Sequence, residues 1–90
     1  MEKPLAKHLI LGIHISDRLV HVGEVQKVLT EFGGQIKTRL GLHQTGEDYC
    51  SPNGLLLLEL LDDDEKKNEL ARRLNAIEGV EVKEMVFDHP

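Results

Sequence analysis

The sequence predicts an α+β fold whose six elements follow in the order strand, helix, strand, strand, helix, strand. Three observations support this: two strongly apolar runs of strand length, two stretches with apolar residues at helical spacing, and glycine- or proline-containing breaks between them. This order is that of the ferredoxin-like βαββαβ sandwich, a four-stranded antiparallel sheet with two helices on one face. Strands one and three usually lie at its centre, and they are the two most apolar runs here.

The first strand is expected at residues 8–15, where the side chains alternate between an apolar face and a mixed face. Ser16 and Asp17 interrupt this run and can cap a helix. The helix that follows is expected to stop at Gly33 and Gly34, through a glycine in the left-handed conformation. Its buried stripe is expected to comprise Val22, Val25, Val28, Leu29 and Phe32.

The second strand is expected at residues 35–43, and its charged residues suit an exposed sheet edge. One of its faces is expected to carry Ile36, Thr38, Leu40 and Leu42, and the other Gln35, Lys37, Arg39, Gly41 and His43. An irregular stretch, residues 44–54, follows and closes with a strong turn signal, Pro52-Asn53-Gly54.

The leucine-rich run at residues 55–61 is interpreted as the third strand, because it is short and a turn signal precedes it. Asp62 or Asp63 is then expected to cap the second helix, with Glu65 in the capping-box position after Asp62. The buried stripe of this helix is expected to comprise Leu70, Ala71, Leu74 and Ile77.

Gly79 is expected to terminate the second helix, and residues 80–87 form the last strand. The alternation of apolar and polar residues in this strand slips between Val82 and Met85. Such a slip is typical of a β-bulge, so a bulge is expected there.

Size and composition limit the possible functions. The 90 residues correspond to one domain, residues 1–90, with a net charge of −5 and a pI of about 5.4. An acidic chain without a basic cluster argues against direct nucleic-acid binding. No apolar run approaches the roughly 20 residues of a membrane span, and a single cysteine, Cys50, fits a reducing cytoplasm.

The sheet face opposite the helices is expected to be apolar, because Leu55, Leu57 and Leu61 point away from the face that the helices cover. Together with Ile10, these four side chains forfeit roughly 6–12 kcal/mol if they stay in water. The sequence therefore predicts a homodimer or homotetramer that associates through this face. The expected interface residues are Ile10, Leu55, Leu57, Glu59 and Leu61.

Several polar residues are expected on the same face by the same alternation. His8 and His14 share it with Ile10 on the first strand, and Lys37, Arg39 and His43 are expected to share it on the second. Glu59 is the lone charge in the leucine run, so its natural partner is Arg39 or His14 of the same or another subunit. Alternatively, Glu59 reaches solvent at the rim.

The connection between the second and third strands holds the densest group of reactive residues in the chain. Loops on a rigid scaffold commonly carry binding residues. Together with the neighbouring strand ends, this connection predicts a site for a small ligand. The candidate ligand-binding residues are His14, Arg39, Gly41, His43, Tyr49 and Cys50.

His43 and Cys50 are also candidate metal ligands, because an imidazole and a thiolate suit nickel, iron or zinc. Two ligands make a weak site, so His14 or a second subunit has to contribute. The structural alternative is a polar strand end and a partly buried cysteine. A catalytic dyad of Cys50 and His43, with Asp48 as the third group, lacks the surroundings of a known protease or transferase, so no enzyme is predicted.

Short motifs along nearly the whole chain resemble a family of small stand-alone domains that are assigned as regulators of the iron-only hydrogenase system. These motifs are Ile13-His14-Ile15-Ser16-Asp17-Arg18, Val28-Leu29, Phe32-Gly33, Arg39-Leu40-Gly41 and Gly79-Val80-Glu81-Val82-Lys83. The resemblance implies an ACT-like domain similar to the ligand-binding domain of the nickel-responsive repressor, without its DNA-binding arm. It also implies a role as a regulator or sensor.

In the nickel-responsive repressor, histidines of the second strand and a cysteine at the start of the third bind the metal across a tetramer interface. The resemblance carries these roles to His43 and Cys50 alone, since Gly41 stands where the repressor has its second histidine. The sequence thus predicts a non-enzymatic regulatory or sensor domain that binds a small ligand, metal or partner protein at a subunit interface. The alternative is a metal-binding accessory protein for a metalloenzyme, using His43 and Cys50.

Overall fold

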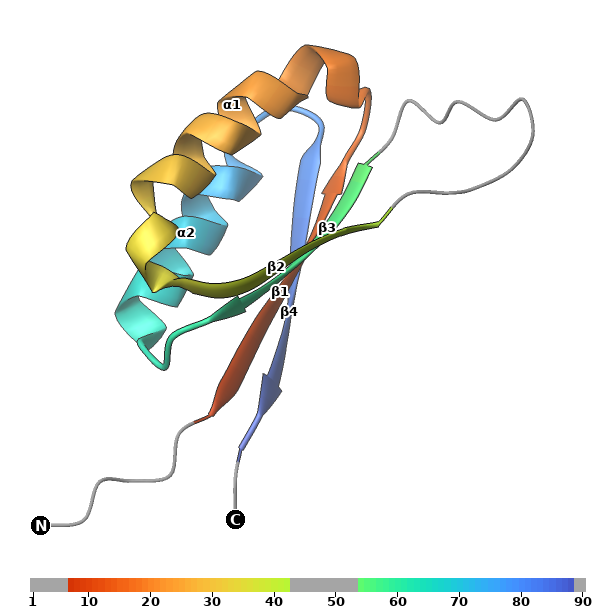
Figure 1. Cartoon of the computed structure of the whole chain (residues 1–90). Coiled ribbons are helices and arrows are strands. Elements are labelled where there is room, and N and C mark those ends of the chain that lie inside the picture. The colour runs from red at the N-terminus through yellow and green to blue at the C-terminus, as the bar shows by residue number, and fades with distance from the viewer. Residues whose placement is uncertain (1–6, 43–53, 89–90) are drawn as a thin grey trace, which may run out of the picture.

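The structure is a computed structural model, and it describes residues 7–42 and 54–88. The described elements follow in the predicted order (Figure 1). They are β1 (His8–Ile15), α1 (Arg18–Glu31), the short 3₁₀ helix η1 (Gly33–Gln35), β2 (Ile36–Leu42), β3 (Gly54–Leu60), α2 (Asp64–Asn75) and β4 (Val80–Phe87).

The four strands form one antiparallel sheet in the order β2-β3-β1-β4. This places the first and third strands at the centre, as the sequence predicts. Both helices cover the same face of the sheet, and the described elements leave the opposite face open (Figure 1). The ferredoxin-like βαββαβ fold class is therefore confirmed.

An aliphatic core lies between the helices and the sheet. In β1 every second side chain is buried, and in β3 Leu58 and Leu60 join the same layer. Both predicted helical stripes contribute to it, except that Val22 is exposed on α1, Ala71 is only partly buried, and the buried Ile77 lies beyond the end of α2. The buried apolar residues are Leu9, Leu11, Ile13, Ile15, Val25, Val28, Leu29, Phe32, Leu58, Leu60, Leu70, Leu74, Ile77 and Val80.

The prediction of a bulge in the last strand is wrong, because β4 pairs with β1 without interruption from Val80 to Phe87. The irregularity lies in β2 instead. There Ile36 is opposite Leu60, whereas Thr38 is opposite Glu59, so one residue of β2 is extra. Every residue of β2 after this point therefore faces the side opposite to the one that simple alternation predicts.

The helix ends also differ in part from the prediction. Asp17 has a left-handed backbone (φ 51°) before α1 and makes no side-chain capping bond there. Of the two predicted caps of α2, Asp63 is confirmed, because its side chain accepts a hydrogen bond from the backbone N–H of Lys66. Gly33 does not adopt the left-handed conformation, since the positive φ angles among the described residues belong to Asp17 and Gly79. The chain after α1 continues into η1 instead.

Candidate functional site

The candidate site is the open face, which we define as the sheet surface that α1 and α2 leave uncovered. Residues directly opposite each other on neighbouring antiparallel strands share a face, so the strand register assigns its members. Ile10, for example, lies opposite Glu59 on one side and Met85 on the other. Across the sheet the open face comprises Thr38 and Leu40 of β2; Leu55, Leu57 and Glu59 of β3; His8, Ile10, Gly12 and His14 of β1; and Glu81, Lys83, Met85 and Phe87 of β4.

The apolar side chains of the open face form a band that crosses the sheet obliquely, and we call this band the apolar diagonal. It runs from Leu40 and Leu55 on one side of the sheet to Met85 and Phe87 on the other. These four side chains are 39–54% exposed. The half-buried residues Ile10 and Leu57 lie between them. The remaining positions of the open face are mostly polar and lie in the two other corners.

One of these corners contains His8, Lys37 and Glu59, and we call it the first polar corner. His8 Nδ1 lies 2.6 Å from Glu59 Oε2, and Lys37 Nζ lies 3.6 Å from the same oxygen. The hydrogen bond with His8 and the attraction of Lys37 hold the pKa of Glu59 below its ordinary value of 4.5. Glu59 is therefore a partnered anion on a largely apolar surface. Its partners differ from the predicted ones, Arg39 and His14.

The opposite corner contains His14, Glu81 and Lys83, and we call it the second polar corner. His14 is opposite Glu81 in the pairing of β1 with β4, and Lys83 is opposite Gly12. This corner lies at the end of the sheet where β2 ends and β3 begins (Figure 1). Because Gly12 has no side chain, no side chain projects from β1 at the position next to Lys83.

The paired state of Glu59 predicts a specific pH dependence of stability. A carboxyl whose pKa is lowered on folding stabilises the fold above its unfolded pKa, and it loses that contribution as the pH falls through its folded pKa. The free energy of unfolding of the wild type should thus fall below about pH 4.5 more steeply than that of Glu59→Gln. Urea unfolding between about pH 3 and 6 measures this. The matched control Glu24→Gln, at an exposed position of α1, should follow the wild type; parallel wild-type and Glu59→Gln profiles would contradict the prediction.

The structure places some of the predicted site residues together and separates others. Ile10, Leu55, Leu57, Glu59 and His14 lie on the open face, as predicted. Leu61 follows β3 directly and is 44% exposed. Its predicted place in an interface stays a prediction.

The extra residue in β2 corrects two other predictions. It places Arg39 opposite the buried Leu58, on the face that the helices cover, and it places Leu40 opposite Leu57 on the open face. The prediction that Arg39 shares the open face with His14 is therefore wrong. Gly41 lies opposite Leu56, also on the helix-covered face.

The remaining candidates, His43, Tyr49 and Cys50, lie outside the described residues, so their predicted roles in ligand or metal binding stay predictions. The sequence prediction also missed four members of the open face on β4, namely Glu81, Lys83, Met85 and Phe87. Without the bulge that was expected in that strand, simple alternation from the buried Val80 would have found them.

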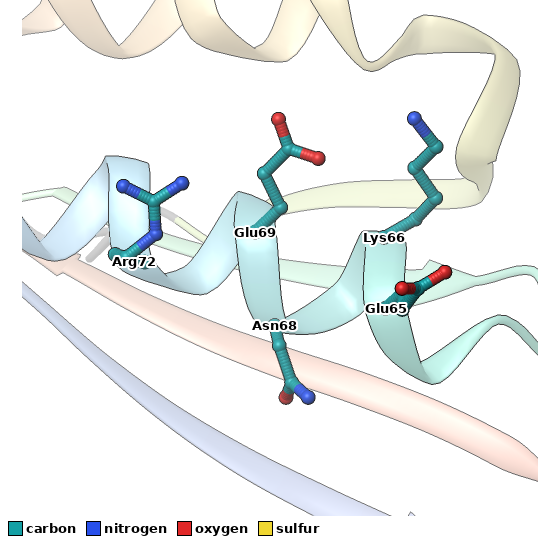
Figure 2. Close-up of a pocket in the computed structure, with 5 residues that line it drawn as sticks. All are labelled: Glu65, Lys66, Asn68, Glu69 and Arg72. Carbon is teal, nitrogen blue, oxygen red and sulfur yellow. The ribbon is translucent and has the colours of Figure 1, made fainter.

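A hollow on the other side of the molecule lies along α2 and has a volume of about 420 Å³ (Figure 2). It is lined by Glu65, Lys66, Asn68, Glu69 and Arg72. Figure 2 shows Glu69, Lys66 and Arg72 extending to one side of the helix and Asn68 to the opposite side. Since one helix supplies the whole lining, this hollow offers no second wall to enclose a ligand.

A smaller hollow of about 280 Å³ lies where α2 meets the end of α1 and η1. Its most prominent cation, Arg73, is already engaged, because it forms an ion pair with Glu31 and stacks over the ring of Phe32 at 5.5 Å. Both interactions join α1 to α2, so Arg73 has a structural explanation.

The described residues lack two features. They contain no group of three or more histidine, cysteine, aspartate or glutamate side chains placed to hold a metal ion. Neither α1 nor α2 combines the length and apolar composition that a helix needs to cross a bilayer.

Among solved structures, the chain is similar to the uncharacterized protein TM1266 from Thermotoga maritima. The two are 28% identical, the match covers 89% of this chain and 96% of the other, and the TM-score is 0.75. No family model matches this chain, and no curated protein matches it.

More distant solved structures share the fold alone. CPII, a nitrogen regulatory PII-like protein from Thiomonas intermedia K12 whose structure holds ADP, AMP and bicarbonate, is 16% identical with a TM-score of 0.55. That match covers 93% of this chain and 96% of CPII. A formyltetrahydrofolate deformylase from Pseudomonas putida KT2440 is 19% identical over 87% of this chain and 28% of its own, with a TM-score of 0.51. The chain therefore has a ferredoxin-like, ACT-like fold that occurs in TM1266 and in a PII-like regulatory protein.

Proposed function

We propose that this protein is a non-enzymatic regulatory or sensor domain in which a small ligand changes the association of the open face with a second copy. The observation that carries the proposal is the open face itself, a broad apolar surface with a polar cluster at each of two corners. A contiguous exposed apolar surface of this kind is typical of an association site. Association that responds to a ligand is a general basis of regulation, because two linked equilibria shift each other.

The second polar corner is the proposed location of ligand binding. His14 and Lys83 supply hydrogen-bond donors, and the position of Lys83 next to Gly12 leaves room above the sheet for a small molecule. Donors of this kind suit a small anion such as bicarbonate or the phosphate of a nucleotide. CPII, with the same fold, is bound to such ligands. For the regulated system we propose iron-only hydrogenase, on the basis of the sequence resemblance alone.

Thermal unfolding and sedimentation of the purified chain, each with AMP, ADP, bicarbonate, Ni²⁺ or Zn²⁺, test this function. A ligand at about ten times its Kd stabilises by roughly 1.4 kcal/mol. That corresponds to an increase in Tm of about 5–10 °C for a domain of this size. We expect AMP, ADP or bicarbonate to give such an increase and to change the dissociation constant of the dimer.

Lys83→Ala should abolish both responses, whereas Lys27→Ala, at an exposed position of α1, should keep them. If none of the five ligands changes either Tm or association, the sensor function is contradicted. A response to Ni²⁺ or Zn²⁺ that survives Lys83→Ala would favour the metal-binding accessory protein.

A further inference from the structure

We propose that the open face closes on the open face of a second copy along the apolar diagonal, with the first polar corner of each subunit against the second polar corner of the other. This inference specifies the association on which the proposed function rests, but it requires no ligand. Its central contact joins Glu59 of one subunit to Lys83 of the partner subunit, and two-fold symmetry makes that contact twice.

The arrangement follows from how the open face is patterned. The apolar diagonal joins two opposite corners of the sheet, and the polar corners occupy the other two. A two-fold axis along the apolar diagonal superposes this band on its own copy and exchanges the polar corners. Leu57 and Ile10 then meet their own counterparts near the axis, and Leu40 meets Leu55 of the partner subunit. Such self-complementarity is what a symmetric dimer interface requires.

The charges of the two corners agree with this exchange. Glu59 arrives above Gly12 and Lys83 of the partner subunit, in the space proposed for the ligand, so a bound anion and the partner's Glu59 compete for Lys83. Lys37 extends from the edge strand toward Glu81 of the partner subunit. Each contact therefore pairs opposite charges, which favours one orientation of the two copies over others.

Two other two-fold axes, one parallel and one perpendicular to the strands, produce mismatches when the sheets are stacked. An axis parallel to the strands places Leu40 on Lys83 of the partner subunit and Ile10 on Glu59 of the partner subunit. An axis perpendicular to the strands places Glu59 on Leu57 of the partner subunit and Met85 on Lys83 of the partner subunit. Both would bury charges against apolar side chains, which is costly.

The proposed geometry has dimensions that can be estimated. The two-fold axis lies along the apolar diagonal, which is inclined to the strands. Because neighbouring strands lie about 4.8 Å apart and successive same-face residues of one strand about 6.6 Å apart, this inclination makes the strands of the two sheets cross at roughly 70°. That lies near the orthogonal class of sheet packing. Four strands of about eight residues give a footprint of roughly 500 Å² per copy. The total of roughly 1,000 Å² lies at the lower limit for specific interfaces.

Charge reversal tests the pairing directly, by sedimentation equilibrium over a dilution series without ligand. Glu59→Lys and Lys83→Glu should each raise the dissociation constant at least tenfold. An equimolar mixture of these two variants should form a mixed dimer with near wild-type affinity, because one of its two pairs is reversed, the other is native, and both are attractive. The double variant Glu59→Lys/Lys83→Glu should recover likewise.

Controls separate this outcome from damage to the fold. Glu59→Lys also disrupts the pair with His8, but Lys83→Glu leaves that pair intact. Far-UV circular dichroism confirms folding of each variant. Glu24→Lys, an exposed charge reversal on α1, should leave the dissociation constant unchanged.

A folded monomer at millimolar concentration, or single variants that weaken association without rescue in the mixture, would overturn the inference. Ligand-induced stabilisation that persists in such a monomer would contradict the dimer and the coupling of ligand to association, but it would leave ligand binding intact. Rescue in the mixture without any ligand response would contradict only the proposed function.

Discussion

Replacing Leu58 with aspartate is expected to abolish folding, whereas the same replacement at the adjacent residue Leu57 is expected to leave a folded chain that no longer associates. Leu58 is fully buried beneath the helices, opposite Leu11 in the central strand β1. Leu57 points to the open face and is half-buried. Two neighbouring residues of one strand therefore report on the two faces of the sheet separately.

The free-energy cost of each substitution, compared with the total stability of the domain, distinguishes these outcomes. Truncating a buried leucine to alanine already costs about 2–5 kcal/mol. An aspartate at this position adds the cost of an unpaired charge in an apolar core. The sum reaches the roughly 5–15 kcal/mol of total stability of a typical domain. At Leu57 the carboxylate stays in contact with water in the monomer, so the cost falls on association instead.

Circular dichroism, urea unfolding and sedimentation equilibrium of the two variants measure this difference. Leu58→Ala serves as the folded reference, with stability lowered by about 2–5 kcal/mol but association unchanged. Val20→Asp, at a position 65% exposed on α1, is the matched control for an added charge and should alter neither property. A folded Leu58→Asp variant, or a Leu57→Asp variant that still associates, would contradict the assignment of faces.

The sequence was sufficient to predict the order and approximate bounds of the strands and helices, because the β1 and β3 runs and the two helical stripes have clear periods, although α2 ends at Asn75 and not at Gly79. It was also sufficient for the sheet order, since the most apolar strands need the central positions. The face of each β2 residue could not be predicted. Alternation from Ile36 onward is regular, so nothing in the sequence marks the extra residue that turns Arg39 toward the helices.

The same limit explains the error in β4. A shift from Val80 and Val82 to Met85 and Phe87 looks like a bulge if only one face of a strand is buried. Here β4 is paired regularly, and its exposed apolar residues lie on the open face because the apolar diagonal crosses β4 at Met85 and Phe87. A sequence pattern alone cannot distinguish a bulge, which shifts the pairing register, from a regular strand in which apolar residues occur first on one face and then on the other.

Gly79→Ala is expected to destabilise the fold by about 2–3 kcal/mol, although the substitution adds a single methyl group. Gly79 has a φ of +82°, where an L-residue is strained by about 1–2 kcal/mol. A Cβ atom there would lie 2.8 Å from Cδ2 of His21 and 3.2 Å from the backbone oxygen of Ser16. Both distances are shorter than an ordinary van der Waals contact, so the strain and the crowding add.

This glycine joins two connections that lie at the same end of the sheet. The backbone N–H of Ser16 donates a 2.7 Å hydrogen bond to the carbonyl of Gly79, which links the β1–α1 connection to the α2–β4 connection. A shift of Gly79 that relieved the crowding would lengthen this bond. The site therefore has little freedom to adapt to a larger residue, except through the side chain of His21.

A double variant separates the two causes. Gly79→Ala alone should lower Tm by roughly 8–24 °C, given about 4–8 °C per kcal/mol for a domain of this size. Adding His21→Ala removes the closest contact but leaves the backbone strain, so the double variant should recover about 1 kcal/mol relative to the sum of the single effects.

Gly33→Ala is the matched control: it has no atom within 4 Å of its new methyl group and no positive φ, so it should not destabilise the chain. If Gly79→Ala unfolded at the wild-type temperature, the tight junction between these connections would be wrong; full recovery with His21→Ala would instead assign the whole effect to crowding and none to backbone strain.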